Sequence, residues 1–430
     1  MITEVENAQQ GIITEKMRNV AKTEGVSPEY IMEQVEEGHI IIVTGSGRRK
    51  SVAIGKGLRT KVNASIGTSS DIVNLDMEIE KAQIAERYGA DTLMELSTGG
   101  DLDLIRREVL KSVDIPVGNV PLYQAAIESI EKYGAVVKMD PDFLFDTIEK
   151  QCEDGIGFMA IHCGVNRTTI ERLKNQGYRH GGLVSRGGAF MTAWMAHNGK
   201  ENPLYERFDE LVEIMKKYDT VLSLGNGMRA GAIADSTDKA QIQELVINAE
   251  LAERARKNGA QVMLEGPGHI PIDEIEANVI LQKSLSNGAP FYMLGPIVTD
   301  VAAGYDHVAS AIGASLSSAY GADFICYVTP AEHLSLPFPE DVKEGVIYAR
   351  IATHVGDMIK LNRRNRDLKV AQARRDRDWD AQFRLFIEPE KGRKMLRKAP
   401  PKEQKTCTMC GEYCALKIAN RYFKEFEPCR

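Results

Sequence analysis

KVNASIGTSSDIVNLDMEIEKAQIAERYGADTLMELSTGGD, residues 61–101, decides the fold. The segment opens with an apolar run at Val62–Ile66, continues through a polar loop and an amphipathic stretch at Asp76–Tyr88, and reaches a second apolar run at Thr92–Leu96. Short apolar runs predict buried strands, and the amphipathic stretch predicts a helix that covers them. Strand, helix and strand in this order predict two parallel strands joined by a crossover helix.

The same alternation continues towards the C-terminus. Six more apolar runs follow, at Ile115–Asn119, Phe158–His162, Thr220–Leu224, Val262–Glu265, Phe291–Leu294 and Phe324–Val328. Further amphipathic stretches lie between them, at Leu204–Tyr218, Ala240–Asn258 and Ile272–Ser284. Eight strands that alternate with helices favour an α/β protein with a (β/α)8 barrel, and an open doubly wound sheet is the alternative. No Gly-x-Gly-x-x-Gly follows the first strand to indicate a nucleotide-binding Rossmann half.

The barrel is expected to span residues 61–340, between two smaller regions. Residues 1–60 predict a small N-terminal domain with two helices and a short strand. Residues 341–398 predict a helical, increasingly charged connector, and its most charged part predicts one solvated helix. The helix-breaking stretch KAPPK then leads into a C-terminal arm at residues 399–430.

Charge is distributed unevenly along the 430 residues. The net charge is −7, but the chain from Lys360 onwards carries 20 Lys and Arg against 10 Asp and Glu. This basic tail lacks the interleaved aromatic residues of a nucleic-acid platform, so we expect no nucleic acid partner. No apolar run reaches the roughly 18 residues that a membrane helix needs, and no secretory signal is present. Seven cysteines without a disulfide pattern favour a cytoplasmic protein.

Three of the cysteines, Cys407, Cys410 and Cys414, fall within eight residues of the arm. Closely spaced thiolates are ligands for zinc or for an iron–sulfur cluster. A structural zinc site needs a fourth ligand, which Cys429 could supply from 15 residues further along the chain. Three close thiolates with a distant fourth fit an iron–sulfur site better, and they leave one iron open for chemistry.

Polar or glycine-rich segments follow every predicted strand. In chain order they are NASIGTSSD, ELSTGGD, GNVPLY, IHCGVN, LGNGMRAG, EGPGH, LGPIVTD and YVTPAEH. In a (β/α)8 barrel these segments meet at the carboxyl ends of the strands, where active sites form. The sequence therefore predicts a substrate site at that end.

Two of these segments end in a histidine, His269 and His333. Imidazoles from different loops of a barrel can hold a divalent metal, with Glu265 or Glu332 nearby as further candidates. The alternative is that the two histidines are unrelated and bond to helix ends or backbone carbonyls.

Anion-binding groups stand in two other segments. Ser185-Arg186-Gly187-Gly188 offers a hydroxyl, a guanidinium and backbone amides ahead of a predicted helix, which suits a phosphate, although a plain turn is the alternative. Arg229 is either a second anion clamp or a salt-bridge partner. His162 ends the fourth strand and is either a general acid or base, or a buried histidine satisfied by its neighbours. Cys326 alternates within the eighth strand and is expected to pack.

Taken together, KVNASIGTS, MELSTGGD, VPLYQA, SRGG, EGPGH, APFYMLGP, GYDH, ICYVTPAEHL and the terminal cysteine triad resemble the radical S-adenosylmethionine enzymes that convert aminoimidazole ribotide. The resemblance covers nearly the whole chain in matching order. It implies a (β/α)8 barrel with an N-terminal domain and a C-terminal arm that carries a [4Fe–4S] cluster on Cys407, Cys410 and Cys414. It also implies S-adenosylmethionine cleavage to a 5′-deoxyadenosyl radical, a reductant such as a flavodoxin or ferredoxin, and a homodimer in which the arm often covers the partner's barrel.

The same resemblance implies roles for residues at the barrel mouth. His269 and His333 would hold zinc or ferrous iron near S-adenosylmethionine, and the catalytic residues would be His162, Asn226, Arg229 and Glu265. The residues implied to contact 5-aminoimidazole ribotide are Asn63, Met94, Tyr123, His162, Ser185, Arg186, Gly187, Asn226, Gly227, Met228, Arg229, Glu265 and Tyr292.

Departures from the family's thiamin-forming pattern point to a different product. Where that pattern has C-x2-C-x4-C, IHAG, GDGLRPG and DIAPGYDH, this chain has C-x2-C-x3-C, Cys163 in IHCG, Asn226 in GNGMRAG and Ala303 in DVAAGYDH. Asparagine in place of aspartate replaces a charged acceptor with a neutral amide in a loop expected to face the substrate. We therefore expect 5-hydroxybenzimidazole, a cobamide lower ligand, to be formed from the same substrate. The alternatives are the thiamin pyrimidine phosphate and, from another class, a zinc-stabilised barrel that only binds a phosphorylated metabolite.

Overall fold

The computed structural model describes residues 2–45, 50–403 and 405–422. The chain forms two compact units, Met1–Leu361 and Asn362–Arg430. Within these described ranges, no helix combines the length and hydrophobicity that a membrane crossing requires.

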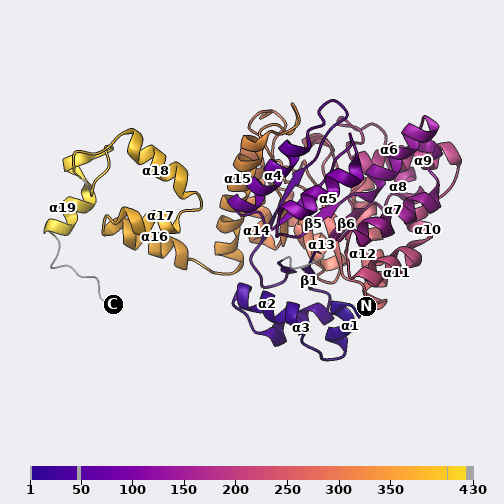
Figure 1. Ribbon diagram of the computed structural model, residues 1–430, viewed down its shortest axis with the longest axis horizontal. Helices are drawn as coiled ribbons and strands as arrows, with labels where there is room; N and C mark the ends of the chain where they lie inside the picture. The colour runs from indigo at the N-terminus through magenta and orange to yellow at the C-terminus, as the bar shows by residue number, and fades with distance from the viewer. Residues whose placement is uncertain (1, 46–49, 404, 423–430) are drawn as a thin grey trace. The chain divides into compact units, whose positions relative to one another are not determined.

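Eight parallel strands close into a barrel in the order β10-β3-β4-β5-β6-β7-β8-β9. Two of them, β5 and β6, are labelled in Figure 1. The strands are β3 (Lys61–Ile66), β4 (Thr92–Glu95), β5 (Val117–Asn119), β6 (Phe158–Ile161), β7 (Val221–Leu224), β8 (Val262–Gly266), β9 (Phe291–Met293) and β10 (Phe324–Cys326). Closure is made by β10, in which Ile325 pairs with Val62 of β3 and with Met293 of β9. The predicted (β/α)8 barrel is confirmed.

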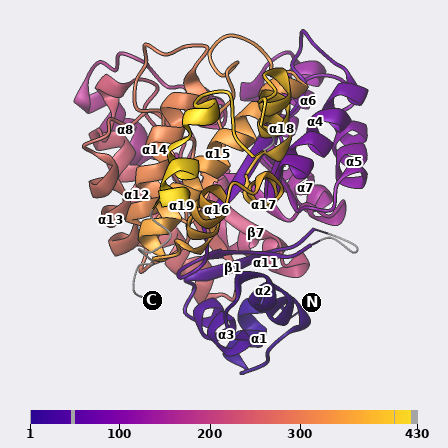
Figure 2. The ribbon, with the colours of Figure 1, turned by 90° about the vertical axis from the view of Figure 1, so that its left-hand side faces the viewer.

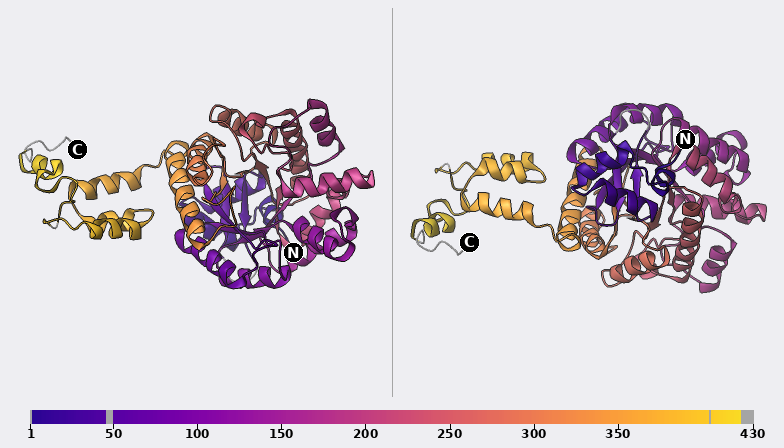
Figure 3. Two further views of the ribbon diagram at one scale, coloured as in Figure 1. Left: turned by 90° about the horizontal axis from the view of Figure 1, so that it is seen from above. Right: turned by 90° about the horizontal axis from the view of Figure 1, so that it is seen from below.

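Helices surround the barrel between successive strands (Figure 3). They are α4 (Leu75–Tyr88), α5 (Leu102–Ser112), α6 (Pro121–Tyr133), α7 (Pro141–Glu153), α8 (Arg167–Gln176), α9 (Arg186–Asn198), α10 (Pro203–Glu206), α11 (Phe208–Tyr218), α12 (Lys239–Lys257), α13 (Ile275–Leu285), α14 (Asp306–Tyr320) and α15 (Pro339–Lys360), with 3-10 turns η1 (Val136–Lys138) and η2 (Ile233–Asp235). Polar N-caps start several of them: the side chains of Asn74, Asp101 and Asp238 each accept a backbone N–H in the first turn. The helix predicted at Leu204–Tyr218 is divided into α10 and α11 at Arg207, whose φ and ψ of −101° and 34° are not helical.

Aromatic rings fill part of the barrel interior. The ring of Phe324 stacks on Tyr292 with centroids 4.2 Å apart, and it meets Phe158 edge-on at 6.0 Å. All three side chains are fully buried. Because the strands are covered by helices outside and by side chains inside, both of their faces are apolar, which explains the continuous apolar runs in the sequence.

The N-terminal region forms a small layer of its own. Its elements are α1 (Glu4–Gln9), α2 (Glu15–Glu24), α3 (Pro28–Glu36) and the antiparallel strands β1 (Ile40–Val43) and β2 (Val52–Gly55). In Figure 2 the three helices lie together beside the hairpin. Met17, Ile31 and Val35 from the helices and Ile40 from the hairpin form one buried apolar cluster.

This layer closes the amino-terminal end of the barrel (Figure 3, right). Glu24 of α2 pairs with the buried Lys61 at the start of β3, at 3.1 Å. Gln261, directly before β8, both accepts from the backbone N–H of Ile42 and donates to its carbonyl. The carboxyl ends of the strands are therefore the end left for a site.

The second unit consists of short helices. They are α16 (Asn365–Arg375), α17 (Trp379–Leu385), α18 (Pro389–Lys398), η3 (Gly411–Tyr413) and α19 (Ala415–Tyr422). The single solvated helix predicted here is interrupted at Arg377, which has a left-handed φ of 57°, so α16 and α17 are separate. The side chain of Arg366 donates to the carbonyl of Leu385 at 2.8 Å and holds the pair together. Cys429, the candidate fourth zinc ligand, lies outside the described residues.

Candidate active site

A cavity of about 890 Å³ opens at the carboxyl ends of the barrel strands. Residues from every part of the barrel contribute to its wall, among them both acidic and basic side chains. The predicted site residues that line it are Met94, Tyr123, His162, Arg186, Arg229, Glu265, His269, Tyr292 and His333. Residues that lie up to 239 positions apart in the sequence, from Met94 to His333, thus meet at one site.

The other predicted contact residues lie behind this wall. They are Asn63, Ser185, Gly187, Asn226, Gly227 and Met228. Asn63 shows what such a residue does: its Nδ2 donates to the hydroxyl oxygen of Tyr292 at 2.9 Å, and its Oδ1 accepts from Thr92 at 2.8 Å. Asn63 therefore fixes the orientation of a cavity-lining phenol.

His162, after the end of β6, is an uncharged imidazole at the cavity floor. Its side chain is buried, and burial together with the charge of Arg229 lowers its pKa to about 3. The hydroxyl of Ser185 lies 3.3 Å from Nε2, whereas Nδ1 has no hydrogen-bond partner among the described residues. A buried imidazole nitrogen without a partner is a candidate substrate contact.

Gly187 is required by the position of His162. A Cβ at residue 187 would lie 2.3 Å from Cε1 of His162, closer than any side chain tolerates. The glycine therefore serves the packing of the imidazole against the start of α9.

Glu265, near the end of β8, supplies a buried carboxyl group. It accepts hydrogen bonds from the hydroxyl of Ser223 and the backbone N–H of Asn226, both at 3.2 Å. Burial raises its pKa, and the positive charge of Arg229 opposes that effect. The group is suited to accept a hydrogen bond or a proton from a substrate amine.

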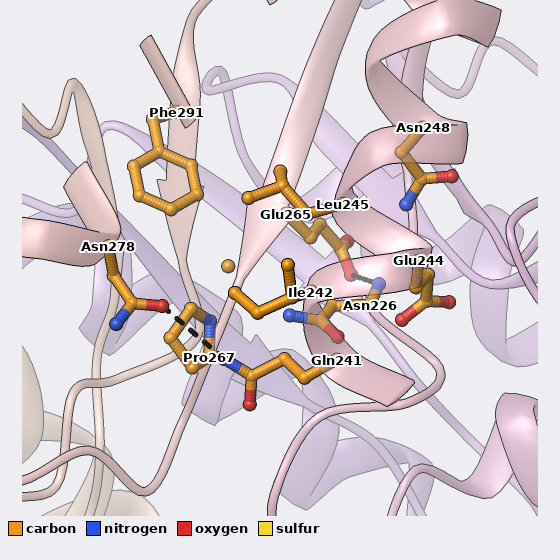
Figure 4. Close-up of a pocket in the computed structure, with 11 residues that line it drawn as sticks. Asn226, Gln241, Ile242, Glu244, Leu245, Asn248, Glu265, Pro267, Asn278 and Phe291 are labelled. Carbon is orange, nitrogen blue, oxygen red and sulfur yellow. Dashed lines mark hydrogen bonds between the residues drawn. The ribbon is translucent and has the colours of Figure 1, made fainter. Parts of the chain in front are cut away.

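Asn226 reaches Glu265 through its backbone rather than through its side chain. Figure 4 shows the N–H bond to Glu265 and the amide group of Asn226 in a separate small pocket, beside Ile242 and Pro267. That pocket has a volume of about 10 Å³ and lies outside the large cavity. The side chain of Asn226 therefore does not line the large cavity, although it was predicted to face the substrate, and its Oδ1 has no hydrogen-bond partner among the described residues.

Two guanidinium groups and a helix end form a positive part of the cavity. Arg186 is the first residue of α9 and lies over the ring of Tyr123, 5.0 Å from its centroid. Arg229 comes from the loop after β7, where its Nη1 donates to the carbonyl of Asn226 at 3.0 Å. Ser185 caps α9 and accepts from the N–H of Gly188. Guanidinium groups beside a helix N-terminus suit a phosphate.

His269 and His333 face each other across the cavity, with ring centroids 5.2 Å apart. The Nδ1 atom of His269 lies 2.7 Å from a carboxylate oxygen of Asp300, and that of His333 lies 3.0 Å from Asp306. A carboxylate on Nδ1 fixes the tautomer that leaves Nε2 free to bind a metal. In the described part of the chain no three His, Cys, Asp or Glu side chains are grouped around a metal position. The pair thus offers two nitrogen ligands and leaves further positions to outside ligands.

The three cysteines of the second unit fit an iron–sulfur cluster by the chemistry of the donor set. All are free thiols; Cys410 is exposed, and Cys407 and Cys414 are partly exposed. Cys410 and Cys414 flank η3, and Cys414 starts α19 through its carbonyl, which accepts from Ile418 at 3.0 Å. Iron and sulfide can therefore reach all three without unfolding of a core.

Cys326 corrects a prediction made from alternation alone. It was expected to pack, but it lines the cavity, and its sulfur lies 3.4 Å from the hydroxyl of Ser65. Its position at the carboxyl end of the last strand was the signal that placed it there.

Glu244 and Arg179 are site residues for which the sequence held no signal. The buried carboxyl of Glu244 accepts from the backbone N–H of Gly227 and Met228, at 2.8 and 2.7 Å. A glutamate in an amphipathic helix is normally expected to face solvent. The bonds from the loop to Glu244 are therefore visible only in the folded structure. Arg179 contacts the same loop from the other side.

The family model described as "Radical SAM ThiC family" matches residues 3–421. The chain belongs to this family. A 5-hydroxybenzimidazole synthase from Geobacter sulfurreducens is 60% identical over 98% of this chain and 98% of that protein. One from Desulfuromonas acetoxidans is 61% identical over 96% of each chain. A phosphomethylpyrimidine synthase from Methanoculleus marisnigri is 61% identical over 97% of this chain and 99% of that protein.

As a member of the radical SAM ThiC family, the protein is a radical S-adenosylmethionine enzyme. Membership implies S-adenosylmethionine and an iron–sulfur cluster, as predicted from the motifs. Among solved structures, a phospho-2-dehydro-3-deoxyheptonate aldolase from Thermotoga maritima has a TM-score of 0.39 at 14% identity, over 75% of this chain and 73% of that chain. This likeness is too weak to carry an argument.

Proposed function

We propose that the protein converts 5-aminoimidazole ribotide to 5-hydroxybenzimidazole as a radical S-adenosylmethionine lyase. The observation that carries the proposal is the set of groups around one cavity: two guanidinium groups and a helix end for a phosphate, and a neutral imidazole and a carboxyl group for a small nitrogen heterocycle. Relatives named 5-hydroxybenzimidazole synthase, about 60% identical over nearly the full length, support the product.

Different residues of the cavity bind different parts of the substrate. Arg186, Arg229 and the N-terminus of α9 bind the phosphate, and Tyr123, under the guanidinium of Arg186, completes that wall. His162 meets the imidazole ring through Nδ1, because that atom has no partner in the described chain and Nε2 is beside Ser185. Glu265 accepts from the ring amine, while Tyr292, held by Asn63, orients the ring from the neighbouring strand β9.

A [4Fe–4S] cluster bound by Cys407, Cys410 and Cys414 would supply the electron that cleaves S-adenosylmethionine. The walls of the cavity would then limit the access of water to the reacting substrate. An electron donor such as a flavodoxin or ferredoxin is required to reduce the cluster. A homodimer in which each arm serves a partner barrel would be consistent with a separate second unit.

His269 and His333 would hold a divalent metal, zinc or ferrous iron. Support comes from their carboxylate partners Asp300 and Asp306, which orient both rings with Nε2 free. The remaining coordination positions would be open to the carboxylate and amine of an amino acid such as the methionyl part of S-adenosylmethionine.

The runner-up product is the thiamin pyrimidine phosphate. It is favoured by relatives of equal identity that are named phosphomethylpyrimidine synthase. Against it stands the shortened C-x2-C-x3-C spacing of the cysteines. A growth test separates the two: the chain is expected not to rescue a thiamin-requiring strain that lacks its own phosphomethylpyrimidine synthase, and rescue would favour the runner-up.

A second test concerns the enzyme class. Protein purified without oxygen should contain iron and sulfide, and it should release 5′-deoxyadenosine from S-adenosylmethionine when 5-aminoimidazole ribotide and a reductant are present. Zinc alone in a colourless preparation, with no 5′-deoxyadenosine, would instead support a barrel that only binds a phosphorylated metabolite.

A further inference from the structure

Two loops bring the arginines of the positive region to the cavity. The 177–185 loop leads from α8 into α9, where Arg186 is the first residue. The 225–238 loop leads from β7 to α12 and carries Arg229. The separation of the two guanidinium groups therefore depends on how these loops are joined.

Arg179 joins them. Its side chain is only 3% exposed, and its Nη2 donates to the carbonyl of Met228 at 2.6 Å. Its Nη1 donates to the carbonyl of Arg229 at 3.3 Å. Thus a guanidinium from the first loop binds the backbone that carries the arginine of the second.

Arg179 is itself fixed by Asp238. The Nε and Nη2 atoms of Arg179 meet the two carboxylate oxygens of Asp238 at 2.5 and 2.8 Å, a bidentate pair. Asp238 is also the N-cap of α12 and accepts from the N–H of Gln241 at 2.9 Å. The guanidinium is thus tied to the first turn of a long helix of the barrel.

The backbone of the two loops interlocks around this contact. Asp235 of the second loop accepts from the N–H of His180 and Gly181 of the first, at 2.8 and 2.6 Å. A Cβ at Gly181 would lie 2.7 Å from the backbone of Gly231. Such close approach leaves the first loop little freedom to shift against the second.

Glu244 holds the adjacent peptide groups of the same segment. It takes the N–H groups of Gly227 and Met228, whereas Arg179 takes the carbonyls of Met228 and Arg229. A carboxyl group and a guanidinium group thus bind complementary backbone groups of one short segment. Lysine could not replace Arg179, because an ammonium lacks the planar fork that serves a carboxylate and two carbonyls together.

We propose that Arg179 is a positioning residue that sets the separation of the Arg186 and Arg229 guanidinium groups and thereby fits the anion site to a phosphate. The inference rests on the proposed function in that the phosphate is taken to belong to the ribotide substrate. Arg179 itself does not line the cavity, so it acts only through the two loops.

Arg179→Ala and Arg179→Lys in the full-length protein test this role. Binding of inorganic phosphate and of 5-aminoimidazole ribotide is measured by calorimetry. We expect both dissociation constants to rise about tenfold in Arg179→Ala and less in Arg179→Lys, because small displacements of a binding group are costly. Millimolar guanidinium should restore part of the affinity of Arg179→Ala. KM for the ribotide should rise while kcat changes little.

Arg172→Ala is the matched control. Arg172 is exposed on α8 and donates to Gln243 of α12 at 3.3 Å, so it also links these elements but not the two loops. Its removal should leave both affinities unchanged. If Arg179→Ala does not fold, as judged by circular dichroism, Arg179→Lys carries the same test.

A double-variant cycle distinguishes positioning from general stability. In an Arg229→Ala background, Arg179→Ala should lose most of its effect on phosphate affinity, because the group that it positions is gone. An equal effect in both backgrounds, or phosphate affinity unchanged in both Arg179 variants, would overturn the role and leave the proposed function standing. A different result would separate the two proposals: phosphate binding is weakened in the Arg179 variants, but the wild-type protein does not bind the ribotide. That result would support the positioning role of Arg179 and overturn the proposed substrate.

Discussion

At the residue scale, the site is organised by side chains that hold other side chains. His162 is neutral because it is buried near Arg229, and it is kept in place by Ser185 and by the absence of a side chain at Gly187. The sequence could indicate which residue types gather at the strand ends. It could not separate those that line the cavity from those behind it, because Asn63 and Asn226 are as polar as their cavity-lining neighbours.

The titration of His162 gives a pH prediction. Its pKa is about 3 in the folded protein, against about 6.5 for an unperturbed histidine. Between these values the unfolded chain binds a proton that the folded chain does not, so the free energy of unfolding falls as the pH drops below 6.5. The contribution approaches about 1.4 kcal/mol per pH unit.

The contribution of His162 to the pH dependence of stability is measured by comparing wild type with His162→Gln. The variant has no titrating group, so its stability relative to wild type should improve steadily from pH 6.5 to pH 4 in urea denaturation. NMR of the imidazole nitrogens should show neutral His162 across the same range. A constant stability difference, or protonation of His162 near pH 6, would contradict the prediction.

At the element scale, the observed strands agree closely with the strands predicted from the sequence. The interruptions of two predicted helices were not predicted. Each predicted apolar run contains its observed strand except at single end residues, such as Lys61 of β3 and Gly266 of β8. By contrast, Arg207 and Arg377 interrupt predicted helices. Arginine is an ordinary helix residue, so neither residue by itself indicates a break. After Arg377 the local signal is Asp378, which caps α17 by accepting from the N–H of Ala381.

The start of α9 has no room for a side chain at residue 187. Gly187→Ala would place a methyl group 2.3 Å from the His162 ring. We expect about 1–3 kcal/mol of lost stability, as for overpacked cores, together with a large loss of turnover. Thermal unfolding and 5′-deoxyadenosine release measure the two effects. His197→Ala, an exposed change in the last turn of the same helix, should leave both unaltered.

The 225–238 loop depends on the carboxyl of Glu244. Glu244→Gln leaves a single acceptor oxygen for two backbone N–H groups and adds an NH2 group that cannot accept. We expect a loss of about 1–3 kcal/mol in denaturant unfolding, because a buried N–H loses its partner. Glu250→Gln, exposed on the same helix, is the control. Equal stabilities of the two variants would show that the Glu244 carboxyl does not hold the loop.

At the scale of the whole molecule, substrate binding and cluster binding are proposed to lie in different units. The cavity lies in Met1–Leu361 and the cysteine trio lies in Asn362–Arg430. The motifs predicted both parts and the family, because loops at strand ends and closely spaced thiols have recognisable sequence patterns.

This division predicts that the two functions can be separated. Cys410→Ala should abolish iron and sulfide content and 5′-deoxyadenosine release, while the barrel keeps its thermal stability and its affinity for 5-aminoimidazole ribotide. Cys152→Ala is the control, because Cys152 is buried against Met159 in the barrel core and should not affect iron content. Retention of the cluster in Cys410→Ala, or loss of ribotide affinity, would contradict the division.

The central claim is the product, and mass spectrometry of one anaerobic reaction tests it most directly. Reconstituted protein is supplied with ring-labelled 5-aminoimidazole ribotide, S-adenosylmethionine and a reductant. The account predicts labelled 5-hydroxybenzimidazole together with 5′-deoxyadenosine. Labelled hydroxymethylpyrimidine phosphate, or turnover of the ribotide without 5′-deoxyadenosine, would contradict it.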